Sequence, residues 1–101
     1  MQKWTPTTDS LQLRRFGKLC EELGELQAVA ARCIIQGIDE IDPSSGIVNR
    51  ARLQDEVSDV YAQLNVLIND LELDYLYILR RTQQKVGNMR KWDELVEKGT
   101  Q

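Results

Sequence analysis

The sequence predicts an all-α fold on three observations. Apolar residues recur at steps of three and four residues along three segments, which is the spacing of one helix face. The two prolines, Pro6 and Pro43, both fall in segments without that spacing. No strand-like alternation of useful length and no internal repeat is evident in the 101 residues. We therefore expect one helical domain over residues 1–101.

The first helical segment follows an N-terminal extension of residues 1–9. Asp9 or Ser10 is suited to cap it, because both side chains accept hydrogen bonds from backbone N–H groups. Gly37 is placed to end it. Its apolar stripe consists of Phe16, Leu19, Cys20, Leu23, Leu26, Ala30, Cys33 and Ile34. The pattern predicts one long helix that stops at Gly37.

Residues 37–49 predict an inter-helix loop, because the stretch 42–46 (DPSSG) is strong turn chemistry. The second helix is expected from about Arg50 to Leu71. Its stripe consists of Leu53, Val57, Val60, Tyr61, Leu64, Leu67, Ile68 and Leu71. After a short break, Asp74 can cap a third helix that runs from Tyr75 to about Glu97. Its helical spacing is carried by Tyr75, Leu79, Thr82, Val86, Met89 and Val96.

Composition excludes several classes of function. With 13 Lys+Arg against 16 Asp+Glu, the net charge of −3 argues against a partner such as a nucleic-acid polymer or an anionic membrane. The chain has no histidine, which removes Ser-His-Asp and Cys-His catalysis and imidazole zinc sites. No apolar run approaches the roughly 20 residues that span a bilayer. With two cysteines and no apolar signal region, we expect a cytoplasmic protein.

Three apolar stripes in so short a chain leave hydrophobic surface that a monomer covers poorly. Pairing with further copies of the chain would cover that surface. We therefore expect an antiparallel helical bundle completed by homo-oligomerisation, as a dimer or a tetramer.

Two acidic pairs share helix faces, because Glu22 and Glu25, like Glu56 and Asp59, stand three residues apart. At about 100° per residue, the first member of each pair lies roughly 80° from its stripe centre and the second roughly 140°, to the same side. In an antiparallel hairpin, residues displaced to the same side of their apolar stripes lie at the same edge of the interface between the helices. We therefore expect the four carboxylates to converge. Glu21 is expected to point nearly opposite the stripe.

Converging carboxylates need a compensating positive charge, which either Lys and Arg side chains or a metal ion could supply. Two carboxylates about 4 Å apart repel by on the order of 4 kcal/mol at an effective dielectric of 20. All-oxygen ligation suits Mg²⁺ or Mn²⁺, and Mg²⁺ typically binds a substrate phosphate as well. A solvated acidic face is the competing interpretation, and we give the two equal weight.

The acidic residues form a known pattern. Residues 21–26 (EELGEL) and 56–60 (EVSDV) match the E-E-x-x-E and E-x-x-D halves of a two-part signature. The sequence resembles the MazG-like all-α nucleoside triphosphate pyrophosphohydrolases over about residues 13–92, in the short single-motif form of phage or prophage members. Lys85, Asn88 and Lys91 are similar to the K-x-x-N-x-x-K element of several members.

The resemblance implies a catalytic centre in which Mg²⁺, with Mn²⁺ as a substitute, is held by Glu22, Glu25, Glu56 and Asp59. A nucleoside triphosphate is then hydrolysed to the monophosphate and pyrophosphate. Glu21 would bind or orient an additional metal ion or the attacking water. Lys85, Asn88 and Lys91 would contact phosphate oxygens.

Several alternatives stay open. Lys18 and Asn65 either bind substrate or are simply exposed, and the 37–49 loop either closes over the base or only connects two helices. A phosphoribosyl-ATP pyrophosphatase shares a similar acidic motif. A non-catalytic helical interaction module, with a structural cation on its acidic rim, is the non-enzymatic alternative.

Overall fold

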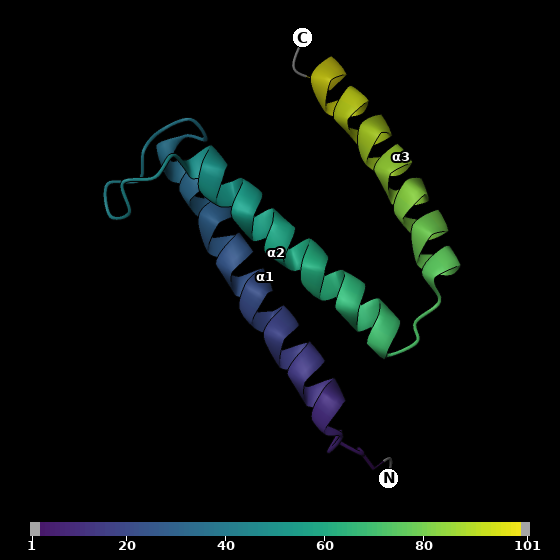
Figure 1. Ribbon diagram of the computed structural model, residues 1–101. Helices are drawn as coiled ribbons and strands as arrows, with labels where there is room; N and C mark the ends of the chain where they lie inside the picture. The colour runs from purple at the N-terminus through teal and green to yellow at the C-terminus, as the bar shows by residue number, and fades with distance from the viewer. Residues whose placement is uncertain (1–2, 100–101) are drawn as a thin grey trace.

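The computed structural model describes residues 3–99, which fold into three helices without a β-strand (Figure 1). Helix α1 spans Ser10–Gln36, α2 spans Asn49–Asp70 and α3 spans Tyr75–Gly99. The predicted all-α class is confirmed. The expected helix ends agree with the observed ones to within two residues, so the apolar spacing located each element correctly.

The helix ends form where the cap chemistry predicted them. The carboxylate of Asp9 accepts a hydrogen bond from the N–H of Gln12 at 2.8 Å, and that of Asp74 accepts one from the N–H of Tyr77 at 3.0 Å. At the end of α1, Gly37 adopts φ 104°, where only glycine is unstrained, and its N–H donates to the carbonyl of Cys33.

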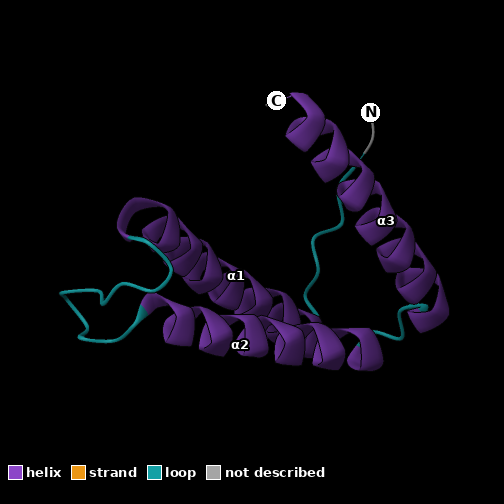
Figure 2. Ribbon diagram, turned by 90° about the horizontal axis from the view of Figure 1, so that it is seen from above, coloured by secondary structure: helices purple, strands orange, loops and turns teal. Residues whose placement is uncertain are grey.

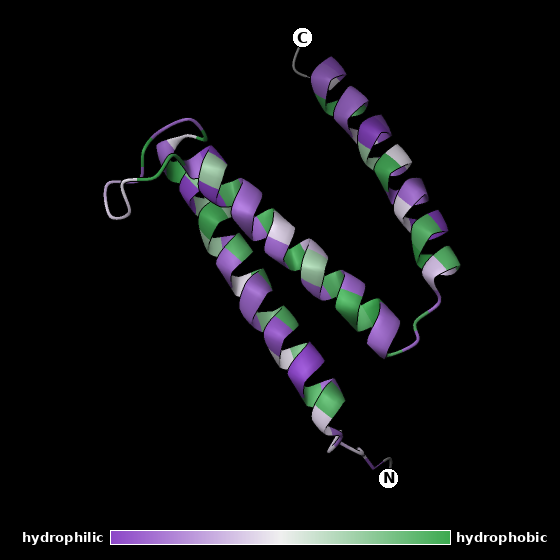
Figure 3. Ribbon diagram, viewed as in Figure 1, coloured by the Kyte–Doolittle hydropathy of each residue, from purple (hydrophilic) through white to green (hydrophobic). Residues whose placement is uncertain are grey.

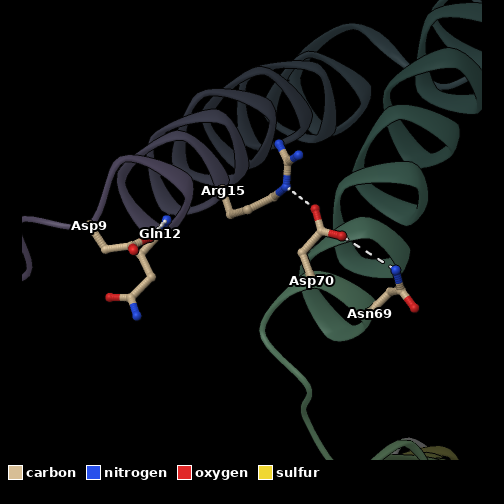
Figure 4. A network of polar contacts seen from close by, with 5 residues as sticks. All are labelled: Asp9, Gln12, Arg15, Asn69 and Asp70. Carbon is tan, nitrogen blue, oxygen red and sulfur yellow. Dashed lines mark hydrogen bonds and ion pairs between the residues drawn. The ribbon is translucent and has the colours of Figure 1, made fainter.

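Helices α1 and α2 form an antiparallel hairpin (Figures 1 and 2). At one end Arg15 Nε donates to Asp70 Oδ2 at 2.7 Å, and Asn69 contacts the other oxygen of the same carboxylate (Figure 4). At the loop end Asn49 Nδ2 donates to Gln36 Oε1 at 3.0 Å. Both hydrogen bonds fit one register, since 21 residues separate the partners along each helix.

The two helices meet along a seam of buried and half-buried residues that alternates steps of four and three. This is the heptad pattern of helices that pack side by side. The seam residues are Arg15, Leu19, Glu22, Leu26, Val29, Cys33 and Gln36 on α1 and Asn49, Leu53, Glu56, Val60, Gln63, Leu67 and Asp70 on α2. Within it the buried apolar core consists of Val29, Val60 and Leu67, so the core is small.

The loop of residues 37–48 is tied to the hairpin end from which it projects (Figure 1). Asn49 is 1% exposed, and its side chain donates to Gly37 O as well as to Gln36. Asp42 accepts hydrogen bonds from Ser44 and Gln36, which hold its pKa below the ordinary value. These contacts give the loop a defined conformation.

Helix α3 stands apart from the hairpin beyond a short turn (Figures 1 and 2). None of its described residues is buried, and apolar side chains such as Leu76, Met89 and Leu95 are each more than 60% exposed. The radius of gyration is 18.0 Å, whereas a compact domain of this length has about 13 Å. The stripe predicted on the third helix therefore forms, but no segment among residues 3–99 covers it.

The stripes predicted on α1 and α2 each divide into two faces. Figure 3 shows hydrophobic residues along both helices. One part of each stripe enters the seam, and the other part is exposed and forms what we call the open face. The open face consists of Phe16, Leu23, Val57, Tyr61 and Leu64. All five directly follow a seam residue, which sets them to one side of the hairpin. Homo-oligomerisation stays a prediction. No helix among the described residues has the length and apolar character to cross a bilayer.

Candidate metal centre

The two acidic pairs converge at the middle of the hairpin. One carboxylate oxygen from each of Glu22, Glu25, Glu56 and Asp59 lies within 4.8 Å of the others. We call these four residues the carboxylate cluster. Its existence confirms that equal offsets on antiparallel helices bring both pairs together.

The cluster is set deeper than the angular estimate indicates. Glu22 and Glu56 are 9% and 6% exposed and occupy seam positions, whereas Glu25 and Asp59 are exposed at the edge. The estimate measured angles from a stripe centre that averaged the seam with the open face. The true centre of contact lies closer to the acidic side, so the first carboxylate of each pair is buried.

Burial and mutual repulsion govern the electrostatics of the cluster. Desolvation raises the pKa of Glu22 and of Glu56, and the neighbouring charges of Glu25 and Asp59 raise both pKa values further. Glu25 lies within hydrogen-bonding reach of both buried glutamates, so it sits between them. Without a cation, the folded chain holds these carboxylates in an environment that disfavours their charge.

Two basic side chains compensate only partly. Lys18 Nζ is 3.9 Å from Glu22 Oε1, and Arg52 Nη2 is 3.6 Å from Glu56 Oε1, so both are ion pairs that are too long for hydrogen bonds. The Oε2 atoms of both glutamates are buried without any hydrogen-bond partner. A buried unpaired carboxylate oxygen is costly unless a cation or donor satisfies it. The donor set therefore fits a divalent cation.

The other predicted residues lie outside the cluster. Glu21 is exposed and pairs with Lys18 at 3.3 Å, as its outward orientation predicted. Asn65 lines a shallow pocket near the α2–α3 turn with Ile68 and Tyr75. Lys85 and Asn88 line a small polar pocket on α3, and Lys91 is exposed on the same helix. Because α3 stands apart, the basic element and the carboxylates do not meet within one chain.

Arg52 is a basic neighbour of the cluster that the motif alone does not predict. The signal for it is a correspondence between the two helices at an offset of 34 residues. Residues 18–26 (KLCEELGEL) align in sequence with residues 52–60 (RLQDEVSDV). In this alignment Lys18 corresponds to Arg52 and Glu22 to Glu56, and most other positions hold similar residues. The same offset relates every seam position of α1 to one of α2. The correspondence is confined to these nine residues and to the spacing of the seam.

Comparison of the chain with protein-family models, with curated proteins and with solved structures found no match. The resemblance to the MazG-like pyrophosphohydrolases thus rests on the residues of the motif themselves. What the geometry adds independently is the convergence of four carboxylates, two of them buried with unpaired oxygens.

Proposed function

We propose that the protein is a Mg²⁺-dependent hydrolase that cleaves nucleoside triphosphates to the monophosphate and pyrophosphate. The observation that carries the proposal is the pair of buried, unpartnered Oε2 atoms of Glu22 and Glu56, facing two further carboxylates. The E-E-x-x-E and E-x-x-D spacing supports the choice of reaction.

Each residue of the cluster has a distinct task in this proposal. Glu22 and Glu56, fixed by the seam, hold the cation, while Glu25 and Asp59 complete its ligands at the exposed edge where a triphosphate can approach. A bound divalent cation neutralises phosphate charge and lowers the pKa of a coordinated water. This chemistry requires no histidine.

The active form is proposed to contain more than one copy of the chain. The open face and the apolar side chains of α3 are the surfaces that a second copy would cover. The substrate contacts of Lys85, Asn88 and Lys91 belong to this assembled form, since α3 does not approach the cluster of its own chain.

The direct test is pyrophosphate release from canonical and modified nucleoside triphosphates with Mg²⁺. Phosphoribosyl-ATP is included as the substrate of the alternative enzyme class. We expect turnover of at least one nucleotide and a loss of about 100-fold or more in Glu56→Gln, which removes a ligand without changing its shape. Asp55→Asn alters the exposed neighbouring carboxylate and should retain activity. Undiminished turnover in Glu56→Gln would contradict the proposed centre.

A structural cation site in a helical interaction module is the second candidate. The separation of α3 from the carboxylates favours it, because one chain alone does not bring the basic element to the cluster. Magnesium titration distinguishes the two candidates. A rise in melting temperature without release of pyrophosphate from any nucleotide would favour the module.

A further inference from the structure

One edge of the hairpin carries charged residues beyond the carboxylate cluster. On each helix, every second seam residue is preceded by a residue that faces this edge. These preceding residues recur every seven positions. Because α1 and α2 are antiparallel, they lie on the same side of both helices. We call these residues the charged edge: Lys18, Glu25 and Arg32 on α1, and Arg52, Asp59 and Val66 on α2.

The register of the hairpin sets the order along this edge. The hydrogen bonds of Arg15 to Asp70 and of Asn49 to Gln36 bring Arg32 level with Arg52 to within one residue. Seven residues of helix correspond to about 10 Å, so this arginine pair lies one step from Glu25 and Asp59. The opposite step holds Lys18 and Val66. At the offset of 34 residues Lys18 corresponds to Arg52 and Glu25 to Asp59. Arg32 corresponds to Val66, so this is the pair of the charged edge at which the charge differs.

Neither guanidinium of this pair has a good partner. The Nε of Arg52 is buried without an acceptor, and its Nη2 reaches Glu56 only at 3.6 Å. Arg32 is half-buried, and its side chain forms no hydrogen bond or ion pair within residues 3–99. By contrast, Arg15 and Arg50 each reach a carboxylate at 2.7 Å. Two arginines at the same level of one edge, with unused guanidinium donors, favour an anionic ligand at that edge.

We propose that Arg32 and Arg52 bind the terminal phosphates of the nucleoside triphosphate, those released as pyrophosphate. This inference rests on the proposed function. The outer phosphates carry most of the charge of the substrate, and a planar guanidinium matches two phosphate oxygens at once. The opposite end offers a single ammonium group, which suits the less charged α-phosphate. The carboxylate cluster is nearly symmetric, because residues 18–26 correspond to residues 52–60. The arginine pair at one end therefore decides in which direction the triphosphate lies.

The experiment measures the binding of Mn²⁺ and the binding of inorganic pyrophosphate separately. Mn²⁺ binding is followed by electron paramagnetic resonance, and the affinity of the Mn²⁺-loaded protein for inorganic pyrophosphate by calorimetry. Arg32→Gln and Arg52→Gln should each weaken pyrophosphate binding by about tenfold or more while changing Mn²⁺ affinity little. Arg14→Gln, at an exposed position of α1 where the guanidinium donates to Ser10, is the matched control and should bind as the wild type does.

The outcomes separate the two claims. Failure of the wild type to bind Mn²⁺ would overturn the metal centre together with this inference. Normal Mn²⁺ binding with equal pyrophosphate affinity in the wild type and both arginine variants would overturn the inference alone. Arg52→Lys keeps the charge beside Glu56 but loses the planar fork, so it should also weaken pyrophosphate binding. It serves as the test if Arg52→Gln does not fold.

Discussion

The burial of Glu56 beside other carboxylates lowers the stability of the folded hairpin, and a single substitution can measure this effect. In the metal-free protein, Glu56→Gln removes one charge from the cluster and keeps the volume of the side chain. We expect the melting temperature to rise by a few degrees, because desolvation and repulsion no longer act at this residue. The wild type should instead gain stability from Mg²⁺, by about 1.4 kcal/mol at tenfold above the dissociation constant, and the variant should gain little.

The same residue predicts the pH dependence of the metal-free protein. Burial raises the pKa of Glu56 above its ordinary value in the folded state. The folded chain therefore binds more protons than the unfolded chain between those two pKa values, and its stability falls as pH rises through that window. Urea titrations at a series of pH values, with a chelator present, should show a weaker dependence in Glu56→Gln. A variant less stable than the wild type throughout would contradict this account.

Among the elements, the connection between α1 and α2 contains one fully buried amide side chain. The side chain of Asn49 is 1% exposed and bridges the last turn of α1 to the loop through Gln36 and Gly37. Asn49→Ala leaves these acceptors unpaired, and we expect a loss of about 1–3 kcal/mol of stability in chemical unfolding. Asn69→Ala, which removes one exposed hydrogen bond to Asp70, should cost much less. Equal losses would mean that the loop is not held by this contact.

The elements also show where a sequence-based prediction succeeds. Helix ends follow local chemistry, so Asp9, Gly37 and Asp74 could be located without knowledge of the fold. The convergence of both acidic pairs followed from spacing and antiparallel connection. The burial of Glu22 and Glu56 did not, because a single stripe of apolar residues does not reveal which half of it meets the neighbouring helix. The third helix was predicted as an element, but its distance from the hairpin depends on tertiary contacts that no local pattern encodes.

At the scale of the whole molecule, the exposed apolar surface predicts association. Tyr61 lies on the open face and is 65% exposed, so Tyr61→Lys disturbs little of the packing within one chain. If copies pair through this face, the substitution should shift the mass measured by light scattering towards the monomer. Ile41→Lys adds the same charge on the 59% exposed loop residue and should not. A wild-type protein that is already monomeric would contradict the predicted assembly.

The correspondence between residues 18–26 and 52–60 also bears on how such a site can originate. Two helices that each carry two acidic residues three positions apart beside a heptad seam bring four carboxylates together when they pair antiparallel in this register. A single helix of this pattern carries half of the cluster, and two such helices joined in one chain are sufficient to complete it. In this chain the corresponding positions Arg32 and Val66 differ, so the two ends of the carboxylate cluster are not equivalent.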